Sequence, residues 1–328
     1  MRIFKDARAR CLSLALLAWT LHATAIKAEE IVVSNYGVSA SGMPFAIAME
    51  KGFFEGKVTG ILSSQGGGTT VRNLLAGDIA YAEVSPIAVA TAIRQGAALK
   101  IISNNVQTVS EFGWMVKSDS PIKSIADLKG KKLGYSSPRS VSQALAMLIV
   151  EKAGLKPSDV QLVMTGGLGE ALVALDLGAI DVAPATEPLL SKYRDKYRII
   201  ATATELFPSM SNVVGVTTEA AAGKRGDFLK SVVAGRAKAV AFMKERPEEA
   251  AAIVAKVYKL ELPVAIQSVR NLIEAKTTLP YWSAGKFDLA GLKEMWRAQI
   301  LVGAAEGDVD WAKLIDERFL PESERGLK

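Results

Sequence analysis

From residue 31 to residue 217, apolar residues fall into short runs that predict strands, separated by stretches with the spacing of helices. Strands that alternate with helices favour an α/β fold with a largely parallel sheet. Beyond residue 217 the periodicity is helical throughout, and no further strand is expected there. The predicted strands cover residues 31–34, 57–62, 79–82, 99–104, 112–116, 160–164, 182–185, 197–202 and 212–217.

A unit of loop, helix, strand and turn occurs twice in the chain. The first copy, residues 64–86, opens with a glycine-rich loop and ends at Pro86. The second copy, residues 165–188, also opens with glycines and ends at Pro188. Two copies of one unit indicate two similar lobes. In each copy, free N–H groups at the helix N-terminus would be available to polar or anionic ligand atoms.

The loops that follow the predicted strands form the expected ligand site. In open α/β sheets, ligands bind beyond the carboxyl ends of the strands, where loops and helix N-termini converge. We therefore expect one small molecule to be held between the two lobes. The candidate contact residues are Ser39, Ser41, Gln65, Gly66, Gly67, Thr69, Glu83 and Ser85 in the first lobe, and Tyr135, Ser136, Arg139, Thr165, Gly166, Thr186 and Glu187 in the second.

The chemistry of these loops leaves alternatives open. Neither glycine-rich loop fits a nucleotide motif, because residues 66–71 lack the Walker lysine and residues 166–169 lack the dinucleotide spacing. The glycines could instead only shape turns. Glu83 and Glu187 could cap the helices that follow them, where a carboxylate suits the helix dipole. Arg139 is the only cation in these loops, so it favours a ligand with an anionic group.

Residues 1–28 have the composition of a secretory signal peptide. A basic beginning precedes an apolar run at residues 11–21, and alanines at positions 25 and 28 offer two cleavage sites. The apolar run is too short to anchor the chain in a bilayer. We therefore expect a mature protein that is exported to the periplasm.

Cleavage would remove the only cysteine, Cys11, and the only histidine, His22. A chain without either residue type cannot form disulfides, metal or haem sites built on Cys or His, cysteine nucleophiles or Ser-His-Asp triads. An enzyme would have to work with carboxylates, Lys, Tyr or a Ser-Lys pair, and the sequence shows no recognisable arrangement of these residues. We therefore expect no enzyme activity, no catalytic residue, no metal and no cofactor.

The net charge gives little information about partners. It is formally +6, and residues 1–28 contribute +4, because they carry five basic residues against one acidic residue. The remaining charges are of both signs and interspersed, so the basicity is no argument for nucleic-acid or membrane binding.

The second repeat and the residues before it resemble a known family. Residues 125–134, 140–154, 159–160 and 166–188 look like those of the substrate-binding proteins of nitrate, sulfonate and taurine-type ABC importers, whose relatives bind thiamine pyrimidine precursors. The resemblance implies a type II periplasmic binding fold. Two α/β lobes, joined by crossing strands near residues 112–116 and 212–216, would close over one ligand. Many members place an aromatic residue before the Glu-Pro pair, whereas Thr186 stands here, which leaves ligands other than sulfonate or nitrate open.

On this resemblance, residues 29–115 and 213–328 would form the first lobe with a helical tail packed on it, and residues 116–212 the second. The expected function is a periplasmic solute-binding receptor that captures a small organic ligand, anionic or aromatic, by hinge closure. Its expected partners are that ligand and an ABC permease in the inner membrane, with no nucleic acid, and we expect a monomer. The alternatives are an exported enzyme on the same fold and a ligand-dependent partner of a membrane sensor.

Overall fold

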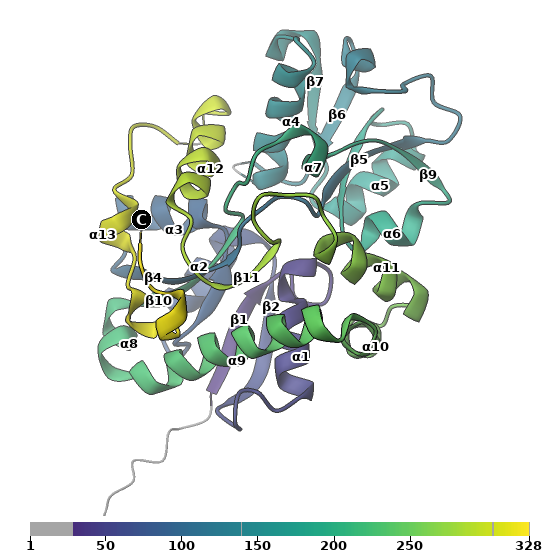
Figure 1. Ribbon diagram of the computed structural model, residues 1–328. Coiled ribbons are helices and arrows are strands. Elements are labelled where there is room, and N and C mark those ends of the chain that lie inside the picture. Colours follow the sequence, from purple (N-terminus) through teal and green to yellow (C-terminus); the bar gives the residue numbers. More distant parts are fainter. Residues whose placement is uncertain (1–28, 139, 304, 328) are drawn as a thin grey trace, which may run out of the picture.

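The computed structural model describes residues 29–138, 140–303 and 305–327. The predicted signal peptide and Arg139 therefore lie outside the described residues. Figure 1 shows two lobes, one above the other, with the helical C-terminal part wrapped around the lower one. Within the described residues, no helix is both long and apolar enough to cross a membrane.

A six-stranded sheet forms the centre of the first lobe, in the order β11-β4-β10-β3-β1-β2. The strands β1, β2 and β3 run parallel, whereas β10 is antiparallel to β3 and β4, and β11 is antiparallel to β4. The sheet is mixed, not largely parallel as predicted, because the chain returns to it from the second lobe through β10 in the opposite direction. The strands are β1 (Glu29–Ser34), β2 (Val58–Ser64), β3 (Ala82–Val84), β4 (Leu99–Val106), β10 (Val213–Thr218) and β11 (Trp282–Gly285).

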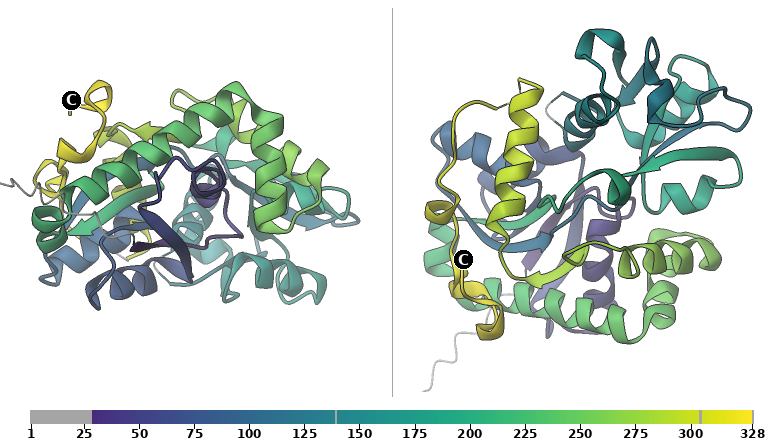
Figure 2. Two further views of the ribbon diagram at one scale, coloured as in Figure 1. Left: turned by 90° about the horizontal axis from the view of Figure 1, so that it is seen from below. Right: turned by 45° about the horizontal axis from the view of Figure 1, so that its top comes forward.

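Helices cover this sheet, and the long helix α9 crosses one face together with α1 (Figures 1 and 2). The turn after α1 approaches α9 closely at Gly235, where a Cβ atom would lie 2.5 Å from Cδ1 of Phe54. The helices of this lobe are α1 (Met43–Glu50), α2 (Gly66–Leu75), α3 (Pro86–Arg94), α8 (Glu219–Lys224), α9 (Gly226–Glu245), α10 (Pro247–Tyr258), α11 (Leu262–Ile273), α12 (Leu289–Leu301) and α13 (Trp311–Leu314).

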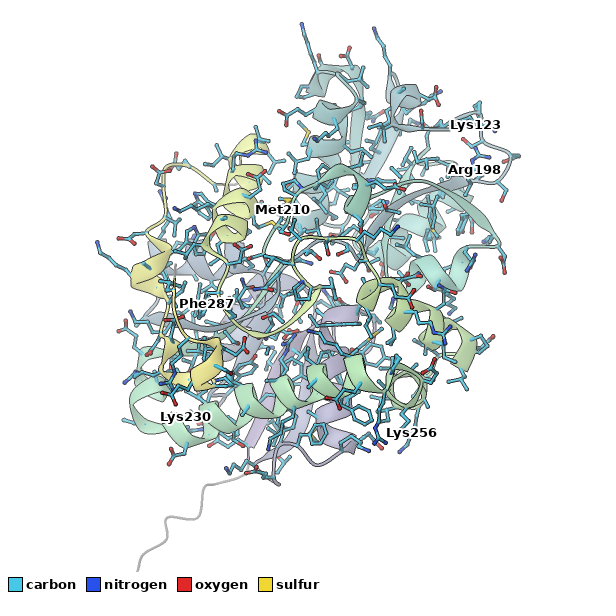
Figure 3. The ribbon with its side chains drawn as sticks, in the orientation of Figure 1. Lys123, Arg198, Met210, Lys230, Lys256 and Phe287 are labelled. Carbon is cyan, nitrogen blue, oxygen red and sulfur yellow. The ribbon has the colours of Figure 1, made fainter. Side chains whose placement is uncertain are left out.

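The second lobe contains a three-stranded sheet, β8-β5-β9, and a parallel pair, β6-β7. A parallel bridge between Leu133 and Val182 brings the two together. Arg198, labelled in Figure 3, donates to the carbonyls of Ser118 and Ser120 and so holds the turn after β5. The elements are β5 (Phe112–Lys117), β6 (Lys132–Tyr135), α4 (Val141–Lys152), β7 (Gln161–Met164), α5 (Leu168–Asp176), β8 (Ala183–Thr186), α6 (Leu189–Tyr193), β9 (Tyr197–Thr202) and α7 (Ala203–Leu206).

The chain passes between the lobes twice. The first crossing segment, residues 107–111, joins β4 to β5, and the second, residues 203–212, joins β9 to β10. Met210, labelled in Figure 3, is fully buried in the second segment. Because β5 pairs with β8 and β9 from Phe112 onward, the sheet of the second lobe begins before residue 116, the predicted limit of that lobe.

Three predictions about local structure were wrong. The strand β11 lies in the part of the chain where only helices were expected. It is short and pairs irregularly with the edge of β4, so its sequence shows no alternation. The glycines of the first repeat belong to α2, which begins at Gly66, and do not form the predicted glycine-rich loop. The strand β3 begins at Ala82, where a strand was predicted from residue 79.

Candidate functional site

The predicted contact loops of the two lobes meet at one edge of the first lobe's sheet. The short 3-10 helix η1 (Ala40–Gly42) follows β1, and the backbone N–H of Ala40 donates to the carbonyl of Glu187 at 3.2 Å. Ser41 is buried, and Ser39 caps η1. The loops after β1 and β8 therefore touch across the two lobes.

Two side chains from the C-terminal part of the chain hold the loop after β1. The hydroxyl of Tyr258 donates to the carbonyl of Ser39 at 3.1 Å, and the indole N–H of Trp282 donates to the carbonyl of Ala40 at 3.0 Å. Sequence reasoning missed this role, because it treated the tail only as a cover for the first lobe.

The helices that begin the two repeats have matching N-termini. Neither α2, with Gln65 at its N-cap, nor α5, with Gly167 there, has a side-chain cap within the described residues. Gly66 is the first residue of α2, and Gly166 directly precedes the N-cap of α5. Their φ angles of 75° and 93° are left-handed, which glycine adopts at little cost. The first-turn N–H groups of both helices are therefore suited to donate to an anion or a polar oxygen.

Two further residues at the start of α2 have packing or local roles. A Cβ atom on Gly67 would lie 2.7 Å from Cβ of Ala88, so this glycine lets α2 approach α3. The hydroxyl of Thr69 accepts from Arg72 at 2.9 Å. At α3 the hydroxyl of Ser85 accepts from the N–H of Ile87 at 3.4 Å, so Ser85 caps that helix.

The second lobe contributes a group of hydroxyls at the start of α4. The hydroxyl of buried Ser142 lies 2.8 Å from that of Ser136 and 2.9 Å from that of Ser140. The Thr165 hydroxyl donates to the carbonyl of Tyr135 at 2.9 Å. The N–H of Gly166 donates to the carbonyl of Ser136 at 2.9 Å, so the loops after β6 and β7 hold each other.

Glu83 is a buried carboxylate that is paired within the first lobe. Its Oε2 lies 3.3 Å from Nε of Arg236 and accepts from the amide of Asn105, while Oε1 has no hydrogen-bond partner in the described chain. Burial raises the pKa of Glu83, and the positive charge of Arg236 opposes that shift. Ser85, and not Glu83, caps the following helix. Sequence reasoning missed Arg236, because helical periodicity does not distinguish a buried arginine from an exposed one.

Glu187 joins the lobes through its side chain. One oxygen accepts from the N–H of Ser191 at 3.2 Å, as a cap for α6, and from the hydroxyl of Ser268 at 2.9 Å. The other accepts from the amide of Asn271 at 2.6 Å. Ser268 and Asn271 belong to α11 of the tail. The neighbouring Thr186 is buried in β8. Ligand contact by Glu187 stays a prediction.

The structure adds a third buried carboxylate, Glu111, which sequence reasoning missed. Its side chain accepts from the amide of Asn212 at 2.7 Å and from the hydroxyl of Ser39 at 3.4 Å. Burial raises its pKa to about 7. In the sequence, Glu111 is notable only because it directly precedes a strand that was predicted to cross between the lobes. A single glutamate at such a position is easily taken for an exposed surface charge.

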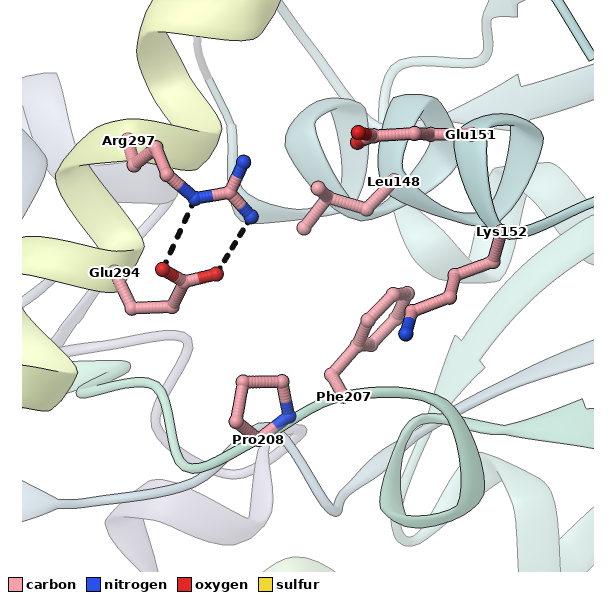
Figure 4. Close-up of a pocket in the computed structure, with 7 residues that line it drawn as sticks. All are labelled: Leu148, Glu151, Lys152, Phe207, Pro208, Glu294 and Arg297. Carbon is pink, nitrogen blue, oxygen red and sulfur yellow. Dashed lines mark hydrogen bonds and ion pairs between the residues drawn. The ribbon is translucent and has the colours of Figure 1, made fainter. Parts of the chain in front are cut away.

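A cavity of about 500 Å³ lies between α4 and α12, and none of the predicted contact residues lines it (Figure 4). Leu148, Glu151 and Lys152 of α4 line it, and Phe207 and Pro208 close it from the second crossing segment. On α12, Arg297 forms two hydrogen bonds with Glu294, of 2.6 and 3.0 Å, so its charge is paired. Among the described residues, no group of three or more His, Cys, Asp or Glu could hold a metal ion.

Comparison with known proteins decides the family. A family model described as NMT1/THI5 like matches residues 40–250, which is more than half of the chain. The chain belongs to the NMT1/THI5-like family. In this NMT1/THI5-like protein, the matched residues include the contact loops from Ser41 to Glu187 and end within α10, before Tyr258 and Trp282.

Relatives of this NMT1/THI5-like protein are known in sequence and in structure. A curated Escherichia coli (strain K12) protein, named for the binding of aliphatic sulfonates, is 29% identical over 152 residues, and the match spans 46% of each chain. The chain thus matches about half the length of this curated relative.

Two solved structures show the fold. The periplasmic aliphatic sulphonate binding protein SsuA from Escherichia coli is 20% identical with a TM-score of 0.71, over 88% of this chain and 97% of that one. The periplasmic nitrate-binding protein NrtA from Synechocystis PCC 6803 is 15% identical with a TM-score of 0.68, over 90% and 87%. The predicted two-lobed periplasmic binding fold and the predicted family resemblance are confirmed.

Proposed function

We propose that this NMT1/THI5-like protein is a periplasmic solute-binding receptor of an ABC importer, without enzyme activity of its own. It would hold one small organic molecule between its lobes and present it to a permease in the inner membrane. We propose that residues 29–111 and 213–328 act as one lobe and residues 112–212 as the other, because β5 pairs with β8 and β9 from Phe112 onward. We also propose that the protein acts as a monomer exported by cleavage of residues 1–28.

The observation that carries this proposal is the pair of uncapped helix N-termini, at α2 in one lobe and α5 in the other. Each begins one copy of the repeat. The hydrogen bond between Ala40 and Glu187 supports it, because it brings the loops of the two lobes into contact at the strand ends. Ligands of open α/β sheets bind at such edges.

The loops favour a ligand with an oxygen-rich or anionic group. N–H groups of α2 and α5 and the hydroxyls near Ser136 would donate to it. Arg236 is engaged with Glu83, so its charge is already paired within the first lobe. The aliphatic sulfonates and nitrate bound by relatives are candidates, although Thr186 leaves room for a different organic ligand.

Native mass spectrometry of the protein exported by its own host tests this proposal. We expect one small molecule bound per chain. We also expect the mass of the chain to be that of a protein that begins at residue 26 or residue 29. Adding that molecule at a hundredfold excess over its Kd should raise the free energy of unfolding by about 2.7 kcal/mol, because it binds only the folded state. An alkanesulfonate and nitrate serve as comparison ligands. A chain that starts at Met1, or turnover of the bound molecule, would contradict the proposal.

A further inference from the structure

Glu111 touches four segments that hinge motion would displace relative to one another. It ends the first crossing segment, and its Oε1 accepts from Asn212 at the end of the second crossing segment, at 2.7 Å. Its Oε2 accepts from Ser39 in the loop after β1, at 3.4 Å. Its backbone carbonyl accepts from the N–H of Glu187 after β8, at 3.0 Å. One residue therefore connects both crossing segments with a loop from each lobe.

This carboxyl group is buried without a counter-charge. Glu111 is 3% exposed, and no described lysine or arginine forms an ion pair with it. The ionisable groups that act on it are Glu187, Tyr258 and Tyr281, and none of them is a cation. The Tyr281 hydroxyl lies near enough to stabilise the charge, but it makes no hydrogen bond of good geometry in the described chain. Burial is the largest effect and raises the pKa of Glu111 to about 7.

Opening of the lobes would change the surroundings of Glu111. It would separate Ala40 from Glu187 and so admit water beside Glu111. A hydrated carboxyl group loses its proton more readily than a buried one, so the pKa of Glu111 would fall toward its usual value. Closure would therefore take up a proton, and a falling pH would favour the closed form.

Glu83 provides an internal contrast, because its partners do not span the lobes. Asn105 lies in β4 and Arg236 in α9, and both belong to the first lobe. Opening would leave these contacts in place, so the ionisation of Glu83 would not be coupled to it.

We propose that Glu111 is a positioning residue for hinge closure: its protonated form keeps the lobes together, and loss of that proton favours their opening. This inference rests on the proposed function only in that the two lobes must open and close. Glu111, which is not among the predicted contact residues, would then determine the fraction of closed molecules near neutral pH.

Distances between two spin labels test the inference without any ligand. One label is placed at Leu75 of α2 and one at Val173 of α5, both exposed and in different lobes, in the exported protein, from which cleavage removes Cys11, the only cysteine. Between pH 5.5 and pH 8.5 the ratio of closed to open molecules should fall by about tenfold or more. In Glu111→Gln, which cannot ionise, the distance distribution should stay that of the closed form at both pH values.

Two further variants complete the test. Glu205→Gln, an exposed change in the second crossing segment, should follow the wild type. Asn212→Ala removes a hydrogen-bond donor that favours the charged form of Glu111, so the midpoint of the transition between closed and open molecules should move to higher pH. This variant tests the inference even if Glu111→Gln folds poorly. Equal distance distributions at both pH values in the wild type, or a Glu111→Gln protein that opens like the wild type, would overturn the inference. If native mass spectrometry nevertheless shows a bound ligand, only the inference about Glu111 is wrong and the proposed receptor function is retained.

Discussion

Replacing Arg236 with methionine should lower the free energy of unfolding by about 3–5 kcal/mol. Arg236 is 2% exposed and faces Glu83 at 3.3 Å. Its guanidinium also donates to the carbonyl of Ser283 at 2.7 Å and to that of Asn105 at 2.8 Å, and lies 5.6 Å from the centre of the Phe45 ring. Without it, the carboxyl group of Glu83 stays buried with no opposite charge. Urea unfolding of the two proteins measures the difference.

The double variant Arg236→Met with Glu83→Gln is the matched control. It removes both charges, so it should recover part of the lost stability, on the order of 1–2 kcal/mol. Because burial already raises the pKa of Glu83 and removing Arg236 raises it further, the deficit of the single variant should be larger at pH 9 than at pH 6. A double variant as unstable as the single one would show that the loss of Arg236 does not destabilise the protein through the unpaired carboxyl group of Glu83.

Replacing Trp114 with alanine should also cost about 3–5 kcal/mol, but in the second lobe. Trp114 is 1% exposed in β5, the central strand of the β8-β5-β9 sheet. Its ring packs edge-on against Phe207 of the second crossing segment, with the ring centres 6.0 Å apart. Its indole N–H has no hydrogen-bond partner in the described chain, so the loss would come from packing. Urea unfolding measures this loss as well.

Leu177→Ala, at a position 79% exposed in the same lobe, should change stability by less than about 0.5 kcal/mol. Hydrogen exchange would then locate each loss. Trp114→Ala should speed exchange of the β5 amides more than those of β1, and Arg236→Met should do the reverse. Equal acceleration in both strands for either variant would contradict the proposed division into two lobes.

Much of the fold could be predicted from the sequence, because apolar runs and helix stops are local signals. Residues 197–202 were predicted as a strand and form β9 with the same limits. The strand β11 could not be predicted, because its pairing with β4 depends on residues distant in the chain. The repeat also located α2 and α5, whose matching N-termini carry the proposed function.

The buried charges could not be predicted for the same reason. Glu83 was noticed as a strand end, but its partner Arg236 lies in a helix of the tail. Glu111 looks unremarkable in the sequence, and only the return of the chain at Asn212 shows that it links both crossing segments. Pairings of this kind depend on the tertiary fold and leave no local pattern.

The most direct measurement is hydrogen exchange of the whole protein, with and without the small molecule recovered from it. A ligand held between the lobes should slow exchange of the amides at the start of α2 and of α5 together, because both helix N-termini would donate to it. Protection at the start of only one of these helices, or protection confined to the cavity between α4 and α12, would show that the ligand does not bind at the N-termini of the two repeat helices.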